Sequence, residues 1–295
     1  MSSDRAPARA PRRRRSRVAL LVRGIALTYL ALLLVLPVLL VFVRTFERGI
    51  EPVIEALSRP AFLAAFRLTI IVTVIAVPFN AIFGVIAAIT LVRHRPRGGA
   101  FLNALIDLPF ALSPVVIGLA LILVYGKFGV IGPELEARGF QVIFAVPGIV
   151  LATILVSLPF VVREVMPLLR EVGTDQEEAA ATLGSGSWRT FRRITLPAIR
   201  WGVIYGVILT TARSLGEFGA VSIVSGKLSG KTETLTLHVE ERFQSFDPVG
   251  AYAASVVLAL MALAVLLGMS VLQSGVIQRR FSRGDRRQAA DQAVR

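Results

Sequence analysis

Two charged side chains lie inside an otherwise apolar stretch of this sequence. Arg213 and Glu217 are four residues apart in "TTARSLGEFGAVSIVSG", residues 210–226. On a helix this spacing allows a guanidinium and a carboxylate to pair, although the order with the cation first is the weaker one. Ionisable groups within membrane segments often mark ion or substrate pathways. The pair is therefore either a structural link between helices or, together with Ser222, part of a gate or pathway for an anion.

A second candidate for chemistry is "SGKLSGKT", residues 225–232, which nearly matches the phosphate-binding loop G-x-x-x-x-G-K-[ST]. The pattern needs glycine at its first position, where this chain has Ser225. The segment is also predicted to lie outside the membrane, away from ATP, in a loop too short for a nucleotide-binding domain. We therefore exclude ATPase activity in this chain. Lys227 and Lys231 are either ordinary solvated residues or outer-face contacts for a binding protein or an anion.

The composition excludes several other chemistries. The chain has no cysteine, which rules out disulfides, Cys-ligated zinc, iron–sulfur clusters and thiol catalysis. Its only histidines, His94 and His238, are far apart in sequence, which argues against a site built from histidines. No Ser/His/Asp, paired-Asp or HExxH constellation is present, so we expect no enzyme activity, no catalytic residue, no metal and no cofactor.

The elements that must position these residues are membrane helices. The 295 residues are 55% hydrophobic, with a mean hydropathy of +0.70. About 20 apolar residues suffice for a helix to cross a bilayer. Six segments are long enough, which predicts an all-α membrane protein with a six-transmembrane-helix bundle over residues 24–275: Gly24–Val43, Leu68–Val92, Leu108–Val124, Phe140–Val162, Trp201–Val224 and Val249–Leu272.

Basic residues predict the orientation of the bundle. Segments 1–23, 93–100, 163–200 and 273–295 hold eight, three, six and six Lys or Arg residues, whereas the alternate loops 44–67, 126–141 and 225–248 hold four, two and three. Because basic residues gather in cytoplasmic loops, both termini and the loop 163–200 are predicted to be cytoplasmic. The same bias explains the net charge of +14, so we expect a lipid bilayer and no nucleic acid as partner. Residues 1–23 and 276–295 are interpreted as basic tails, the first of them disordered.

The cytoplasmic loop 163–200 begins with signals for a short helix. Thr174 and Glu177 have the T-x-x-E spacing of a capping box. The alanines at 179–181 favour helix propagation, and Gly184 is placed to end the helix in a left-handed conformation.

A second short helix is predicted to follow, with Ser187 as its N-cap. Trp188, Phe191 and Ile194 recur every three residues and form one apolar stripe, with arginines beside it. Pro197 marks the junction with the fifth span. A surface of aromatic side chains and arginine is typical of protein-binding hot spots. The loop therefore either folds onto its own bundle or docks a cytosolic partner.

The spacing in this loop resembles a known family. It reads E-A-A-x3-G-x9-I-x-L-P, which is the EAA loop of the membrane subunits of ABC importers. The resemblance implies a bacterial plasma (inner) membrane permease of the type I, MetI-like architecture, whose coupling helix lies in a groove of the ATP-hydrolysing subunit. It also implies two copies of that ATPase subunit, a second homologous permease subunit and an extracytoplasmic binding protein. The matching positions, which the resemblance assigns to the ATPase contact or its support, are Glu178, Ala179, Ala180, Gly184, Ile194, Leu196 and Pro197.

A second resemblance concerns the substrate. "SLGEFGAVSIVSG" and "GKTETLTLHVEE" are similar to the sulfate and thiosulfate permease subunits, most closely to the W-type of the two paired permeases, over most of residues 24–275. This implies import of sulfate or thiosulfate. Molybdate permeases have a related G-E-F-G-A segment, so molybdate, tungstate or another oxyanion is the alternative. A stand-alone secondary anion carrier also stays open on the residues alone.

Overall fold

The computed structural model describes residues 17–268 and 270, and all regular secondary structure in that part of the chain is helical. The elements in chain order are α1 (Arg17–Leu30), η1 (Ala31–Val35), α2 (Leu36–Phe46), α3 (Glu51–Ser58), α4 (Pro60–Ile89), η2 (Thr90–His94), α5 (Gly99–Ala111), α6 (Pro114–Tyr125), α7 (Gly132–Ala137), α8 (Val146–Val172), α9 (Asp175–Thr182), α10 (Ser187–Thr190), η3 (Phe191–Thr195), α11 (Leu196–Leu215), α12 (Gly219–Val224), α13 (Leu235–Gln244) and a last helix, Pro248–Gly268.

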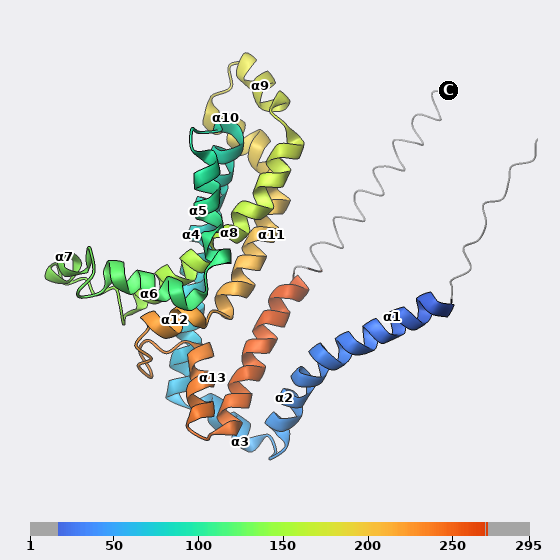
Figure 1. Ribbon diagram of the computed structural model, residues 1–295, viewed down its shortest axis with the longest axis vertical. Helices are drawn as coiled ribbons and strands as arrows, with labels where there is room; N and C mark the ends of the chain where they lie inside the picture. Colours follow the sequence, from blue (N-terminus) through green and yellow to red (C-terminus); the bar gives the residue numbers. More distant parts are fainter. Residues whose placement is uncertain (1–16, 269, 271–295) are drawn as a thin grey trace, which may run out of the picture.

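The molecule is an elongated helical bundle (Figure 1). Helices α9 and α10 lie at one end and α3 and α13 at the opposite end, while α6 runs across the bundle between them. Within the described residues, five helices are long and apolar enough to cross a membrane, or six if the bent pair α5–α6 counts as one span. They confirm the predicted all-α, multi-pass membrane fold. The five are Ala19–Phe46, Pro60–His94, Val146–Val172, Ser187–Leu215 and Pro248–Gly268.

The third predicted span is not one straight helix. Helices α5 and α6 meet at an angle of 115°. The residues between them, Leu112 and Ser113, are extended, with ψ angles of 145° and 137°. Proline disfavours the helical conformation of the residue before it, so Pro114 accounts for the extended backbone of Ser113 and for the break. A hydropathy window averages over such a bend and therefore predicted a continuous span.

The fifth predicted span also has different limits. Its helix runs from Ser187 to Leu215, and the chain then breaks before the short helix α12. Glycines let α12 cross α6 closely at this point. A Cβ atom on Gly219 would lie 2.8 Å from Cβ of Pro114, and one on Gly118 would lie 2.8 Å from Cβ of Ile223. These separations are too short for real atoms, so the crossing depends on both glycines.

The centre of the bundle is a contact among α4, α8 and α11. Val161 of α8 fits between two glycines, Gly84 of α4 and Gly206 of α11. A Cβ atom at Gly84 would lie 2.6 Å from Cβ of Val161, and one at Gly206 would lie 2.7 Å from its Cα. Helices in membranes associate through such small residues, because lipid removes most of the hydrophobic driving force between them. The three helices form the closely packed centre of the fold.

The first membrane helix, Ala19–Phe46, diverges from the bundle (Figure 1) and buries none of its apolar window. Its exposed side chains are mostly Leu and Val, which suits contact with lipid or with another membrane chain. Residues 17–23, the end of the predicted basic tail, form the start of α1. The predictions for residues 1–16 and 276–295 lie outside the described residues.

Candidate coupling surface and membrane pathway

The first helix predicted in the loop is confirmed as α9. Gly184 follows it with φ +75°, a conformation that costs an ordinary L-residue about 1–2 kcal/mol. Two hydrogen bonds close the turn: the N–H of Ser185 donates to Ala180 O at 2.9 Å, and the N–H of Gly184 donates to Ala181 O at 3.0 Å. This pair of bonds is the Schellman motif that glycine favours at helix ends. The backbone conformation itself therefore favours glycine at position 184.

The second short helix is not separate, and the prediction of Ser187 as its N-cap is wrong by one residue. Gly186 is the N-cap, and the helix that begins at Ser187 continues without interruption to Leu215. A π-helical turn makes this possible. The N–H of Leu196 donates to Phe191 O, five residues back, and Pro197, which has no N–H, follows directly. Pro197 therefore lies within a continuous helix.

The predicted capping box is also absent. The hydroxyl of Thr174 donates to Glu178 Oε1 at 2.6 Å and makes no hydrogen bond to the backbone of α9. Glu177 faces the bundle: its Oε1 accepts the hydroxyl of Thr195 at 2.8 Å, and its Oε2 lies 3.0 Å from Nε of Arg93. A charged hydrogen bond is stronger than one from a neutral amide, which explains why the carboxylate turns to Arg93.

Arg93, in the π-helical turn η2 that continues α4, connects three segments. Its Nη1 donates to Leu169 O at 2.9 Å and its Nη2 to Gly173 O at 2.7 Å, so it satisfies carbonyls at the end of α8. The same Nη2 donates to Glu177 Oε1 at 3.2 Å. The side chain is only 11% exposed. The guanidinium thus fixes α9 to the ends of α4 and α8. In the sequence alone, Arg93 counts only as one basic residue of a cytoplasmic loop.

Some residues at the EAA-type positions are exposed and others are half-buried. Leu183 and Trp188, which lie beside them, are 88% and 72% exposed, and the Trp188 ring stacks on Phe191 with centroids 5.5 Å apart. Phe191 itself is half-buried against the bundle. The end of the molecule around α9 therefore presents an exposed surface on a firmly packed base. Of the predicted coupling residues, Glu178, Ala179, Gly184 and Pro197 are exposed, and Ala180, Ile194 and Leu196 are half-buried.

The predicted pair of Arg213 and Glu217 forms an ion pair, with Nη2 2.7 Å from Oε2. Glu217 is buried in the break between α11 and α12. Its Oε1 accepts the N–H of Ala220 at 3.0 Å, and its backbone carbonyl accepts the hydroxyl of Thr236 at 2.8 Å. Ser222 does not join the pair, because its hydroxyl donates to Gly219 O within α12. The pair thus holds α11, α12 and α13 together at the break.

The two predicted outer-face lysines differ in their surroundings. Lys227 Nζ lies 2.7 Å from Glu240 Oε2, an ion pair that joins the loop to α13. Lys231 is exposed. Helix α13, which Lys227 contacts through Glu240, lies at the end of the bundle opposite α9 (Figure 1).

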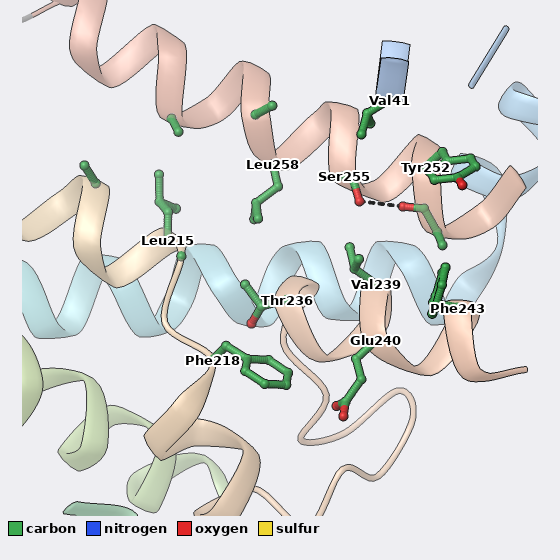
Figure 2. A pocket seen from close by; sticks show the side chains of 15 residues that line it. Val41, Leu215, Phe218, Thr236, Val239, Glu240, Phe243, Tyr252, Ser255 and Leu258 are labelled. Carbon is green, nitrogen blue, oxygen red and sulfur yellow. Dashed lines mark hydrogen bonds between the residues drawn. The ribbon is translucent and has the colours of Figure 1, made fainter. Parts of the chain in front are cut away.

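A cavity of about 610 Å³ lies between α13 and the last helix, with Val41 of α2 at its edge (Figure 2). Its walls are mostly apolar, including Leu215, Phe218 and Leu258, and Glu240 is the acidic residue in its lining. Within the part of the chain that the structure describes, the cavity is lined by no Lys or Arg. An oxyanion would find no positively charged partner on the described walls, so this surface suits contact with another apolar chain or lipid better than anion binding.

Comparison with known proteins identifies the family. Residues 80–282 match the binding-protein-dependent transport system inner membrane component. The chain belongs to this family. The sulfate transport system permease protein CysW of Synechocystis sp. is 48% identical over 257 residues, which cover 87% of this chain and 93% of that protein. The corresponding CysT of Escherichia coli K12 is 38% identical over 252 residues, which cover 85% of this chain and 91% of that protein.

A solved structure agrees with the fold. A chain of a bacterial alginate ABC transporter, in complex with an alginate pentasaccharide-bound periplasmic protein, has a TM-score of 0.69 to this chain at 16% identity. The match covers 86% of this chain and 93% of that one. The family match and the sequence relatives confirm the ABC permease resemblance carried by the E-A-A spacing, and this structure confirms the fold.

The hydrogen bonds of Arg93 lead to a prediction about the free energy of local opening of α9. Hydrogen bonds to a charged group contribute about 1.5–3 kcal/mol, and a loss of about 2 kcal/mol corresponds to roughly thirtyfold faster local opening. In the variant Arg93→Gln, amide hydrogen exchange across residues 174–184 is expected to accelerate by about that factor. The exposed Arg97 provides the matched control, since Arg97→Gln removes one positive charge nearby. Unchanged protection in Arg93→Gln would contradict the anchoring role.

Proposed function

We propose that this chain is the W-type permease subunit of an ATP-driven importer of sulfate and thiosulfate. The observation that carries the proposal is the 48% identity to a CysW sulfate permease over 87% of the chain, which exceeds the 38% identity to a CysT subunit. In this proposal the chain transports and a separate subunit hydrolyses ATP. The near-match to a phosphate-binding loop at residues 225–232 has no part in nucleotide binding, because it lies at the end of the bundle opposite α9.

The proposed importer contains two copies of an ABC ATPase subunit, this chain and a homologous CysT-like permease. An extracytoplasmic sulfate-binding protein delivers the anion to the end that carries Lys227 and Lys231. The end that carries α9 faces the cytosol of a bacterial cell, as do both termini. Residues 24–275 act as the transmembrane domain and the segments 1–23 and 276–295 as basic tails, in line with the bias of Lys and Arg toward the cytoplasm.

The proposed mechanism uses α9 as the coupling element. Glu178, Ala179 and Gly184 are exposed on it and free to meet an ATPase groove, where small side chains permit close approach. ATP-driven closure of the ATPase dimer displaces α9, and Arg93 passes the displacement to α4 and α8. For the transport cycle to turn, nucleotide must bind one of the two bundle arrangements better than the other.

The anion's route through the membrane is proposed to pass near the break that follows α11. The chain is unwound there, and Glu217 is held by Arg213 and by the N–H of Ala220. Backbone that leaves a helix at membrane depth is tolerated where it is packed in protein or lines a pathway. Arg213 and Ser222 are the polar side chains near this break to which we assign hydrogen bonds with a passing anion.

Gly184 provides a test of the coupling element. Valine at this left-handed position is strained by at least about 1–2 kcal/mol, whereas asparagine tolerates the conformation. In the assembled importer, Gly184→Val is expected to lower the ATP hydrolysis stimulated by the loaded binding protein about tenfold, and Gly184→Asn to retain most of it. If both variants hydrolyse ATP and transport as the wild type does, α9 is not the coupling element.

The substrate assignment is tested by growth. A bacterial strain that lacks sulfate import is complemented by this gene together with its ATPase, second permease and binding protein. We expect these genes to restore growth on limiting sulfate. We expect them not to restore growth of a strain that is limited for molybdate. Rescue on molybdate but not on sulfate would overturn the assignment. Sulfate flux into vesicles that contain this chain and no ATPase would instead favour a secondary carrier.

A further inference from the structure

Three side chains that the transport mechanism does not use meet beside α13, at the end of the bundle opposite α9. Glu233 lies just before the helix, and His238 and Glu241 are three residues apart on it. One carboxylate oxygen of Glu233, one ring nitrogen of His238 and one carboxylate oxygen of Glu241 lie within 4.8 Å of one another. Sites built from several histidines leave a spacing pattern in the sequence, but a group with a single histidine such as this one does not.

The burial of the cluster is what points to a ligand. Glu233 and His238 are 3% and 4% exposed. Oε1 of Glu233 lies 3.0 Å from Nδ1 of His238, but its Oε2 is buried and accepts no hydrogen bond within the described residues. A buried carboxylate oxygen without a partner is costly, and native proteins normally satisfy such atoms with a hydrogen bond, water or an ion. A bound cation would supply the missing partner.

The cluster combines three side-chain groups that bind divalent metals in proteins. Two carboxylates and one imidazole are a ligand set that suits zinc and related divalent transition metals.

We propose that Glu233, His238 and Glu241 bind one divalent transition-metal ion of the Zn²⁺ class. Ligands 2.0–2.2 Å from a tetrahedral ion are about 3.4 Å apart, and the three ligand atoms already lie within 4.8 Å of one another. The side chain of Glu241 is 42% exposed, which leaves it room to turn toward the ion.

Arg242 is the competing cation at this site. It holds Oε2 of Glu241 at 2.5 Å, but its Nη1 is also 4.0 Å from Oδ2 of Asp247. It can therefore turn to Asp247 when the metal takes the carboxylate. A metal bound here joins the loop that ends at Glu233 to α13, the helix whose Thr236 holds the carbonyl of Glu217. The site would stiffen the outer end of the permease, independently of which anion is carried.

The test measures metal directly. The full-length chain, purified with a tag that contains no histidine and placed in lipid nanodiscs, is stripped with a chelator and exposed to Zn²⁺. Bound zinc is counted by mass spectrometry, and Co²⁺ replaces zinc to give a visible ligand-field spectrum. We expect one Zn²⁺ per chain, and at least about tenfold weaker binding in His238→Gln. The chain's other histidine is the matched control, and His94→Gln should bind as the wild type does.

A second variant, which is expected to bind Zn²⁺ more tightly, controls for misfolding. Arg242→Gln removes the competing cation and is expected to bind Zn²⁺ several-fold more tightly than the wild type, which a damaged fold would not do. Absence of zinc uptake by the wild type, or uptake that persists in His238→Gln, would overturn the proposal. So would weaker binding in Arg242→Gln. Sulfate transport enters none of these readouts, so failure of the metal site and failure of the proposed substrate are distinguishable.

Discussion

The contacts of the Arg93 guanidinium hold together the end of the molecule that carries α9. A guanidinium that is 11% exposed is costly unless its donors are paired, and here they meet two carbonyls at the end of α8 and the carboxylate of Glu177. Leu169 lies in α8, Gly173 follows it directly, and Glu177 lies in α9. Helix α9 therefore cannot leave the bundle without exposing or orphaning these groups, and it moves with α4 and α8.

Glycines allow close helix contacts in two parts of the bundle: its packed centre and the place where the broken helices cross. Gly84 and Gly206 let α4 and α11 close onto Val161 of α8, which makes one packed unit. Gly118 and Gly219 let α6 and α12 cross where the two broken helices meet. In the proposed mechanism, a displacement of α9 passes through this closely packed unit to the segment around Glu217. The backbone has left the helix there, so this segment is the proposed place for a change between two conformations.

The sequence predicted the membrane class, most helices and the α9 turn, because these depend on local signals: apolar length, basic loops and the glycine at 184. It did not predict the bend at Pro114 or the break after Leu215, since hydropathy averages over both. The capping box failed because Glu177 has a better partner in Arg93, 84 residues away in the chain. Contacts of that kind arise from tertiary structure and leave no mark in local spacing.

The sequence did not indicate the cluster of Glu233, His238 and Glu241 for a related reason. Spacing rules search for several histidines or cysteines close together in sequence, and His238 stands alone in that respect. What distinguishes it is burial beside Glu233 and Glu241, which only the folded chain shows. The EAA-type spacing, in contrast, contains seven fixed positions over a short segment, and these residues alone were enough to indicate the family.

If the Arg93 contacts make α9 and the bundle move as one body, the distance between them stays constant when ATP binds. The chain has no cysteine, so spin labels can be placed at Gln176 on α9 and Ile82 on α4, both exposed, without background from this subunit. Pulsed electron spin resonance then compares the nucleotide-free and ATP-trapped importer. We expect the same narrow distance distribution in both states. A shifted or broadened distribution on ATP trapping would show that α9 moves independently and would contradict this expectation.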